Sequence, residues 1–134
     1  MHITLETDYA VRIVNCLVIN NKRLDAKSIS EQTNVTLRFS LKILRKLVSS
    51  GVVKSFKGAQ GGYELNRPAK DISLYDIVET IEGEYTFCRC LQEGYTCIEH
   101  RDEDDGCCCN FRGVYDEISQ LVRKKLKSTT FDSI

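Results

Sequence analysis

Two helix-like segments separated by only two residues constrain the fold of this chain more than any other feature. The separating residues are Asn34 and Val35, which form a tight turn. Thr36 follows directly and can cap the next helix with its hydroxyl group. Two helices connected by so short a turn predict a helix-turn-helix.

Capping residues and apolar spacing place both helices of this pair. The first is predicted from Leu24 to Thr33, with Asp25 or Ser28 as its capping residue. The second is predicted to end near Gly51, because glycine suits the left-handed position after a helix. Its predicted buried stripe consists of Phe39, Ile43, Leu44 and Leu47.

One helix is predicted before this pair and two after it. Apolar spacing from Asp8 to Leu17 predicts a first helix that ends near residues 20–21. Ser73 can cap a short helix that runs through Glu82, and a last helix is predicted from Asn110 to Lys127. The last helix is predicted to pair with its copy in a homodimer, because one side of it is apolar: Phe111, Val114, Tyr115, Ile118, Leu121, Val122 and Leu126.

A glycine-rich hairpin is predicted directly after the helix-turn-helix. The segments Val52 to Phe56 and Tyr63 to Leu65 are strand-like and flank residues 57–62, which include three glycines. A hairpin in this place predicts a winged helix, in which the third helix enters the major groove of DNA. The hairpin tip then reaches the flanking backbone or the minor groove.

The distribution of charge supports a polyanionic partner, although the formal net charge is zero. Residues 1–70 contain 12 Lys and Arg against 5 Asp and Glu, whereas residues 71–134 contain 7 against 14. A solvated surface would explain such counts equally well, but their coincidence with the helix-turn-helix favours double-stranded DNA. The predicted DNA contacts are Thr36, Arg38, Lys42, Arg45 and Lys46 on the third helix, and Lys57, Gly58 and Gln60 in the wing.

Nothing in the sequence resembles a signal peptide or a membrane span, since Arg12 and Asn15 interrupt the longest apolar stretch near the N-terminus. We therefore expect a cytoplasmic protein with a single main core. In that compartment thiols stay reduced, so structural disulfides are not expected.

Six of the seven cysteines lie between Cys88 and Cys109, in a predicted loop. Thiolates select zinc, copper(I) or iron–sulfur clusters over calcium or magnesium. The spacing lacks the repeated paired cysteines that are usual for structural zinc, so zinc fits poorly, and a thiol redox switch is a third option. The remaining cysteine, Cys16, is expected to be a buried core residue of the first helix.

The chain resembles the bacterial winged-helix regulators of the IscR, NsrR, RirA and CymR type over nearly its whole length. The segments that carry the resemblance are residues 1–4, 7–12, 29–31, 51–53, 58–63 and 72–78. The resemblance implies a mainly α fold with a small β-hairpin. It implies a DNA-binding domain at 1–83, a cysteine-rich cluster-binding loop at 84–109, and a dimerisation helix and tail at 110–134.

The resemblance also implies a metal centre, because cluster-bearing members have three cysteines in this loop. These correspond to Cys90, Cys97 and Cys109, with Cys88, Cys107 and Cys108 as alternates. Some members use a histidine as fourth ligand at the position of Arg112, and others use an aspartate of the partner subunit that Asp8 matches. Asp8 can equally be a helix cap. The expected cofactor is a [4Fe-4S] cluster, with [2Fe-2S] as the alternative.

The resemblance thus implies a transcriptional regulator, with repression of a palindromic operator as the expected mode. Nitric oxide, oxygen or redox state, or iron would be its signal. The alternative is a cluster-free regulator that depends on thiol redox chemistry or zinc. We expect no enzymatic activity and no small-molecule substrate, because the sequence has no phosphate-binding loop and no evident nucleophile–base pair.

Overall fold

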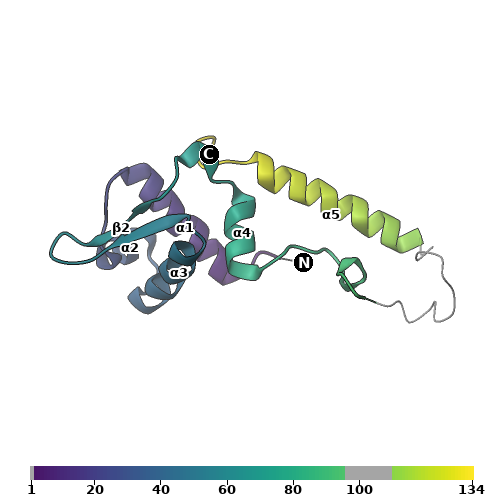
Figure 1. Ribbon diagram of the computed structural model, residues 1–134, viewed down its shortest axis with the longest axis horizontal. Coiled ribbons are helices and arrows are strands. Elements are labelled where there is room, and N and C mark those ends of the chain that lie inside the picture. The colour runs from purple at the N-terminus through teal and green to yellow at the C-terminus, as the bar shows by residue number, and fades with distance from the viewer. Residues whose placement is uncertain (1, 96–109) are drawn as a thin grey trace.

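The computed structural model describes residues 2–95 and 110–134 and has the predicted architecture, mainly α with one small hairpin. Figure 1 shows a body formed by the first helices and the hairpin, from which the last helix extends away. The elements are α1 (Leu5–Asn20), α2 (Ala26–Thr33), α3 (Leu37–Ser49), β1 (Val53–Phe56), β2 (Gly62–Leu65), η1 (Ala69–Asp71), α4 (Leu74–Glu82), η2 (Arg89–Leu91) and α5 (Asn110–Ser128).

Helix α1 begins earlier than the apolar spacing predicted, and this corrects the interpretation of Asp8 as a helix cap. The capping residue is Thr4, whose hydroxyl oxygen accepts a hydrogen bond from the backbone N–H of Thr7. Asp8 lies inside the helix and pairs with Arg12 at 2.8 Å. Capping therefore does not explain the presence of an aspartate at position 8.

The helix-turn-helix follows the predicted boundaries closely. Asp25, rather than Ser28, caps α2 by accepting a hydrogen bond from the Ser28 backbone N–H at 2.7 Å. Asn34 then adopts the left-handed conformation at φ 55°, which ends α2 and turns the chain toward α3. Thr36 caps α3 through the backbone N–H of Phe39.

The core lies between α1, α2, α3 and α4 and confirms most of the predicted stripe on α3. Ile43, Leu44 and Leu47 are completely buried. Phe39 is 44% exposed, so its prediction as a core residue was wrong. Its ring packs edge-on against Tyr9 at the surface, with 6.1 Å between the ring centroids.

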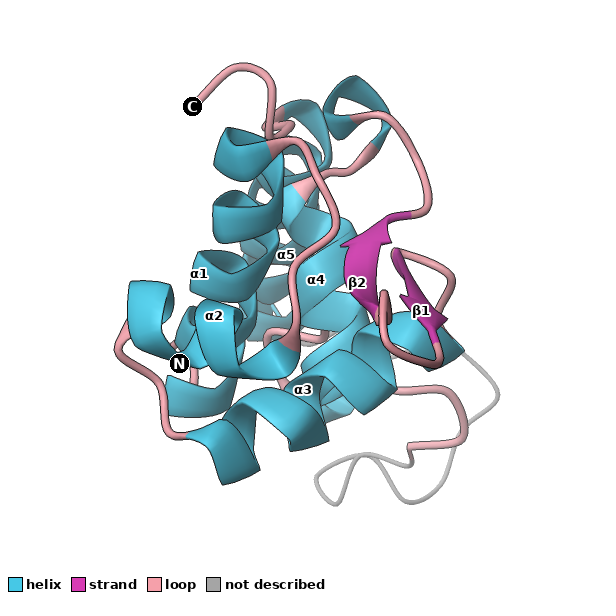
Figure 2. Ribbon diagram, turned by 90° about the vertical axis from the view of Figure 1, so that its left-hand side faces the viewer, coloured by secondary structure: helices cyan, strands magenta, loops and turns pink. Residues whose placement is uncertain are grey.

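The wing is an antiparallel pair of four-residue strands that lies to one side of the helices (Figure 2). Val53 faces Leu65 and Phe56 faces Gly62. Leu24 extends the sheet, because its backbone N–H and C=O both bond to Tyr63, at 3.0 and 2.7 Å. A Cβ atom on Gly62 would lie 2.5 Å from the Leu24 carbonyl oxygen, so this close approach requires glycine.

A capping box begins α4, and the C-terminal segment packs beside it. Ser73 and Asp76 bond reciprocally through side chain and backbone. The backbone N–H of Phe131 donates to the Ile72 carbonyl at 3.1 Å. The Phe131 side chain is 2% exposed and belongs to the core, a role that the sequence did not reveal.

Helix α5 ends within one residue of its predicted boundary and leaves part of its apolar side uncovered. Phe111, Val114 and Leu121 are 70%, 53% and 68% exposed. This exposure agrees with pairing of α5 with a second copy, which stays a prediction. No helix among the described residues has the length and apolar character needed to cross a membrane.

Candidate nucleic-acid interface and cysteine segment

The outer side of α3, which we call the α3 face, consists of Leu37, Arg38, Leu41, Lys42 and Arg45. Helical spacing places them together, because residues three and four positions apart are neighbours on a helix. With Phe39 they line an open groove of about 1040 Å³. Within the described residues, Arg38 and Arg45 form no ion pair, so both guanidinium groups are available to an external anion.

Glu6 of α1 binds two of the lysines that the sequence assigned to DNA. Its carboxylate oxygens lie 3.1 Å from Lys42 Nζ and 2.7 Å from Lys46 Nζ. The hydrogen bond from Lys46 is the main reason why the pKa of Glu6 is below its ordinary value, although burial opposes this change. Both lysines therefore bond to α1, and Lys42 also lines the groove of the α3 face. Sequence reasoning missed Glu6, because Lys42 and Lys46 lie 36 and 40 positions after it in the chain. No local spacing rule relates residues so far apart.

The predicted wing residues Lys57, Gly58 and Gln60 lie at the exposed hairpin tip, where Gly58 has φ 91°. The sequence did not reveal the role of Arg23, which holds this tip. Its guanidinium group lies 3.3 Å from the centroid of the Phe56 ring and donates to the Gln60 carbonyl at 3.1 Å. A fixed tip can present its backbone N–H groups to a phosphate in one orientation.

Cys88 and Cys90 lie on the segment that follows α4, at the start of η2. The Cys90 thiol donates to Cys88 Sγ at 3.4 Å. The backbone N–H of Cys90 also bonds to Cys88 and holds the pKa of the Cys88 thiol below its ordinary value. The shared hydrogen bond raises the pKa of Cys90, and the positive charge of Arg112 opposes that rise. The pair therefore favours one thiolate, on Cys88.

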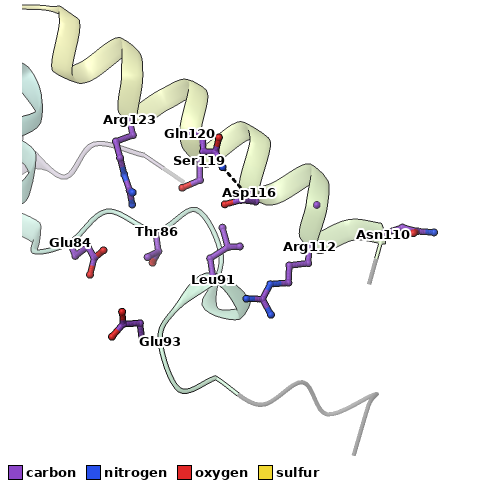
Figure 3. Close-up of a pocket in the computed structure, with 11 residues that line it drawn as sticks. Glu84, Thr86, Leu91, Glu93, Asn110, Arg112, Asp116, Ser119, Gln120 and Arg123 are labelled. Atoms are coloured by element: carbon purple, nitrogen blue, oxygen red, sulfur yellow. Dashed lines mark hydrogen bonds between the residues drawn. The ribbon is translucent and has the colours of Figure 1, made fainter. Parts of the chain in front are cut away.

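Helix α5 packs along this cysteine segment. Arg123 donates to the Tyr85 carbonyl at 3.0 Å, and the rings of Phe87 and Tyr115 are 5.7 Å apart. A cleft of about 850 Å³ separates the two elements. Figure 3 shows its two sides, with Glu84, Thr86 and Leu91 on the segment and Arg112, Asp116 and Arg123 on α5.

The described residues contribute only part of the predicted metal-binding set. Cys97, Cys107, Cys108 and Cys109 lie outside the described residues. Within residues 2–95 and 110–134, no three His, Cys, Asp or Glu side chains are close enough to hold a metal ion. Cys88 and Cys90 nevertheless fit a soft metal or an iron–sulfur cluster, because both are partly exposed sulfur donors.

The two other candidate residues, Asp8 and Cys16, lie on α1. Asp8 is partly exposed and bonds to Arg12, so ligation by Asp8 of a partner subunit stays a prediction. Cys16 is buried, as expected, and burial raises the pKa of its thiol. A buried thiol of this kind is a core residue rather than a ligand.

A hydrogen-bonded link joins the cysteine segment to α1. Glu82, the last residue of α4, accepts from the backbone N–H of Thr4 at 3.2 Å and from the hydroxyl groups of Thr4 and Thr7. Burial acts to raise the pKa of Glu82, but these hydrogen bonds outweigh it and the pKa is below its ordinary value. The segment with Cys88 follows Glu82 directly, so these hydrogen bonds hold the start of that segment beside the start of α1.

Comparison with known protein families gives one match that spans almost the whole chain. Residues 3–134 match the family described as "Rrf2: Iron-dependent Transcriptional regulator". The chain is similar to protein rrf2 of Nitratidesulfovibrio vulgaris, with 25% identity over 137 aligned positions that cover 97% of this chain and 84% of that protein. It is 34% identical to protein aau3 of Rhizobium meliloti over 95 residues, which are 70% of this chain and 62% of that protein.

Solved structures share the fold. CymR, the global cysteine regulator of B. subtilis, superposes with a TM-score of 0.76 and 23% identity, over 99% of this chain and 95% of that chain. IscR of T. potens gives the same TM-score and identity, over 99% of this chain and 85% of that chain.

Proposed function

The chain belongs to the Rrf2 family of transcriptional regulators, and we propose that it is a repressor whose affinity for its operator is controlled by an iron–sulfur cluster. The family consists of DNA-binding regulators, which confirms the prediction that this chain is not an enzyme. The sensing of nitric oxide, oxygen or redox state, or iron belongs to the proposal.

The observation that carries the DNA-binding part is the α3 face. It presents Arg38, Lys42 and Arg45 on the second helix of a helix-turn-helix, beside a glycine-rich wing. Such a helix enters the major groove, where guanidinium groups bind guanine edges and phosphates. Lys57 and Gln60 of the wing supply donors for the flanking backbone.

The cysteine chemistry supports the cluster part of the proposal. Cys90 is the proposed ligand from the described residues, with Cys88 as its alternate, and Cys97 and Cys109 complete the proposed cysteine set. A cluster bound there would supply a centre that nitric oxide, oxygen or iron shortage can dismantle. The thiolate is the form that binds metals, and the positive charge of Arg112 opposes the rise in the pKa of Cys90 that its hydrogen bond to Cys88 causes.

Contacts within the chain offer a route from the cysteine segment to the α3 face. Glu82 holds the N-terminal turn of α1 through Thr4 and Thr7, and Glu6 in that turn holds Lys42. A change in the segment after Glu82 would therefore act on the position of a cation that faces DNA. A coupling of about 1–3 kcal/mol, which is typical of allosteric proteins, would change operator affinity about 5–150-fold.

A homodimer is part of the proposal, because a subunit interface would bury the exposed apolar side chains of α5. Phe111, Val114 and Leu121 form an apolar stripe that suits a second α5. A two-fold dimer would present two α3 faces, which suits a palindromic operator. In such a dimer Asp8 of the partner subunit would be available as the fourth ligand.

Anaerobic purification followed by absorption spectroscopy and by iron and sulfide analysis tests the cluster. The wild type is expected to be coloured, and Cys90→Ala, Cys97→Ala and Cys109→Ala are each expected to lose colour and iron. Cys16→Ala is the matched control, since it removes a buried thiol of the core. Operator affinity of the loaded and the cluster-free protein is then compared by fluorescence anisotropy, and equal affinities would contradict the proposed control.

A thiol-redox or zinc regulator is the second candidate, and the 3.4 Å contact between the sulfur atoms of Cys88 and Cys90 favours it. This alternative predicts a colourless protein under iron-replete anaerobic conditions. It also predicts that operator affinity responds to an oxidant or to a zinc chelator, and that Cys88→Ala abolishes the response.

A further inference from the structure

The α3 face carries two leucines that its proposed role in phosphate binding does not explain. Leu37 is 46% exposed and Leu41 is 40% exposed. They are four residues apart and therefore lie on the same side of the helix. Phe39 is also exposed, but its ring packs against Tyr9.

Charge around the leucines identifies what can cover them. Arg38, Lys42 and Arg45 line the same groove, and α3 contains no Asp or Glu. A second copy of this face would bring like charges together, which is unfavourable. Duplex DNA instead provides phosphates for the cations, and its major groove holds one apolar group, the methyl group of thymine.

We propose that Leu37 and Leu41 bind thymine methyl groups in the major groove and so set part of the base preference of this regulator. The inference rests on the proposed binding of DNA by α3. Side chains four residues apart on a helix are separated by about 5–6 Å, and successive bases on one strand by about 3.4 Å. The two thymines are therefore at most about two base steps apart within each half-site.

Replacement of thymine by deoxyuridine tests this proposal directly, because uracil lacks the methyl group and keeps every hydrogen-bonding atom. The operator is first selected from a random duplex library with the full-length, anaerobically purified protein. Each thymine of the selected sequence is then replaced singly by deoxyuridine. We expect the wild type to lose affinity about four-fold at each of two thymines per half-site, as expected for a buried group of methyl size.

The variants Leu37→Ala and Leu41→Ala assign the contacts. Each is expected to lose sensitivity to deoxyuridine at one thymine and to keep it at the other. Ile19→Ala is the matched control, because Ile19 is an exposed aliphatic residue on α1, at 74% exposure. This control is expected to behave like the wild type. Circular dichroism checks that the fold is intact, which we expect because the substituted side chains are exposed.

Three outcomes would overturn the proposal. The first is a wild type that binds all deoxyuridine duplexes as tightly as the parent, and the second is a selected operator without thymines. The third is a pair of leucine variants that retain full sensitivity at every position, or that change the oligomeric state instead. Failure of the proposed DNA-binding function would look different, because the library would then yield no enriched duplex.

Discussion

Glu6→Gln is expected to strengthen DNA binding at low salt and to make binding more dependent on salt. In the wild type, one carboxylate lies within 3.1 Å of Lys42 Nζ and within 2.7 Å of Lys46 Nζ. A phosphate that approaches Lys42 therefore competes with Glu6. Glutamine keeps the size of the side chain and removes its negative charge, which adds one net positive charge beside the α3 face.

The size of the effect follows from counterion release. The slope of log K against log salt changes by about 0.9 for each additional phosphate that the protein neutralises on duplex DNA. One additional charge thus makes the slope steeper by about 0.9. Between 50 and 200 mM salt, the advantage of the variant over the wild type should shrink about 3.5-fold, because that slope acts over a four-fold change in concentration.

Fluorescence anisotropy with a labelled duplex, measured at four or five salt concentrations, gives both slopes. Glu117→Gln is the matched control, because it makes the same change of charge on the exposed surface of α5. It is expected to leave the slope unchanged. In the background of Glu6→Gln, the further change Lys42→Gln should restore the wild-type slope, since it removes the freed charge.

A result in the opposite direction would refute this reasoning. If Glu6→Gln weakens binding at every salt concentration without a change of slope, then Glu6 does not compete with phosphate. Its ion pairs would then serve to hold α3 in the orientation that DNA requires. The double variant distinguishes the two roles, because it cannot rescue a lost orientation.

Three further predictions concern stability and assembly. Ser73→Ala should lower the free energy of unfolding by about 1 kcal/mol in urea denaturation, because it removes the cap of α4; Ser73→Thr, which keeps the hydroxyl group that caps α4 and donates to Asp76, should cost less. Leu121→Lys should convert the proposed dimer into monomers in analytical ultracentrifugation, whereas Ile19→Lys on α1 should not. Glu82→Gln should destabilise the fold at neutral pH, because the folded-state pKa of Glu82 is below its ordinary value of 4.5. The contribution of Glu82 to stability is present above pH 4.5 and is lost as the pH falls through the lower folded pKa, so the two unfolding midpoints should converge in acid.

Local signals predicted the helix-turn-helix and the wing because their determinants are local. A capping side chain such as Asp25, a left-handed residue such as Asn34 and a run of glycines act within a few residues. The start of α1 was predicted wrongly because one of its determinants is a long-range contact. Thr4 and Asp8 are both capping residue types, and Thr4 is further held by Glu82, 78 residues later in the chain.

Long-range contacts explain what sequence reasoning missed at the candidate site. The exposed cations of α3 followed from helical spacing, but the pairing of Lys46 with Glu6 depends on how α1 crosses α3. Phe39 fitted the apolar stripe by spacing, yet Tyr9 holds it at the surface. Of the predicted ligand set, the structure describes only Cys88, Cys90 and Asp8, so the arrangement of the other cysteines stays a prediction.

The buried side chain of Phe131 anchors the C-terminal end of α5, so the helix can tilt about that end. Phe131 packs into the core just beyond the C-terminal end of α5, while the other end of the helix lies near η2 and Cys90. A helix of 19 residues is about 28 Å long at ~1.5 Å per residue. A tilt of about 10° around the anchored end would therefore displace the far end by about 5 Å. Conversely, a small displacement of the end of α5 beside the cysteines would rotate α5 by a small angle. This is the helix that is proposed to join two subunits.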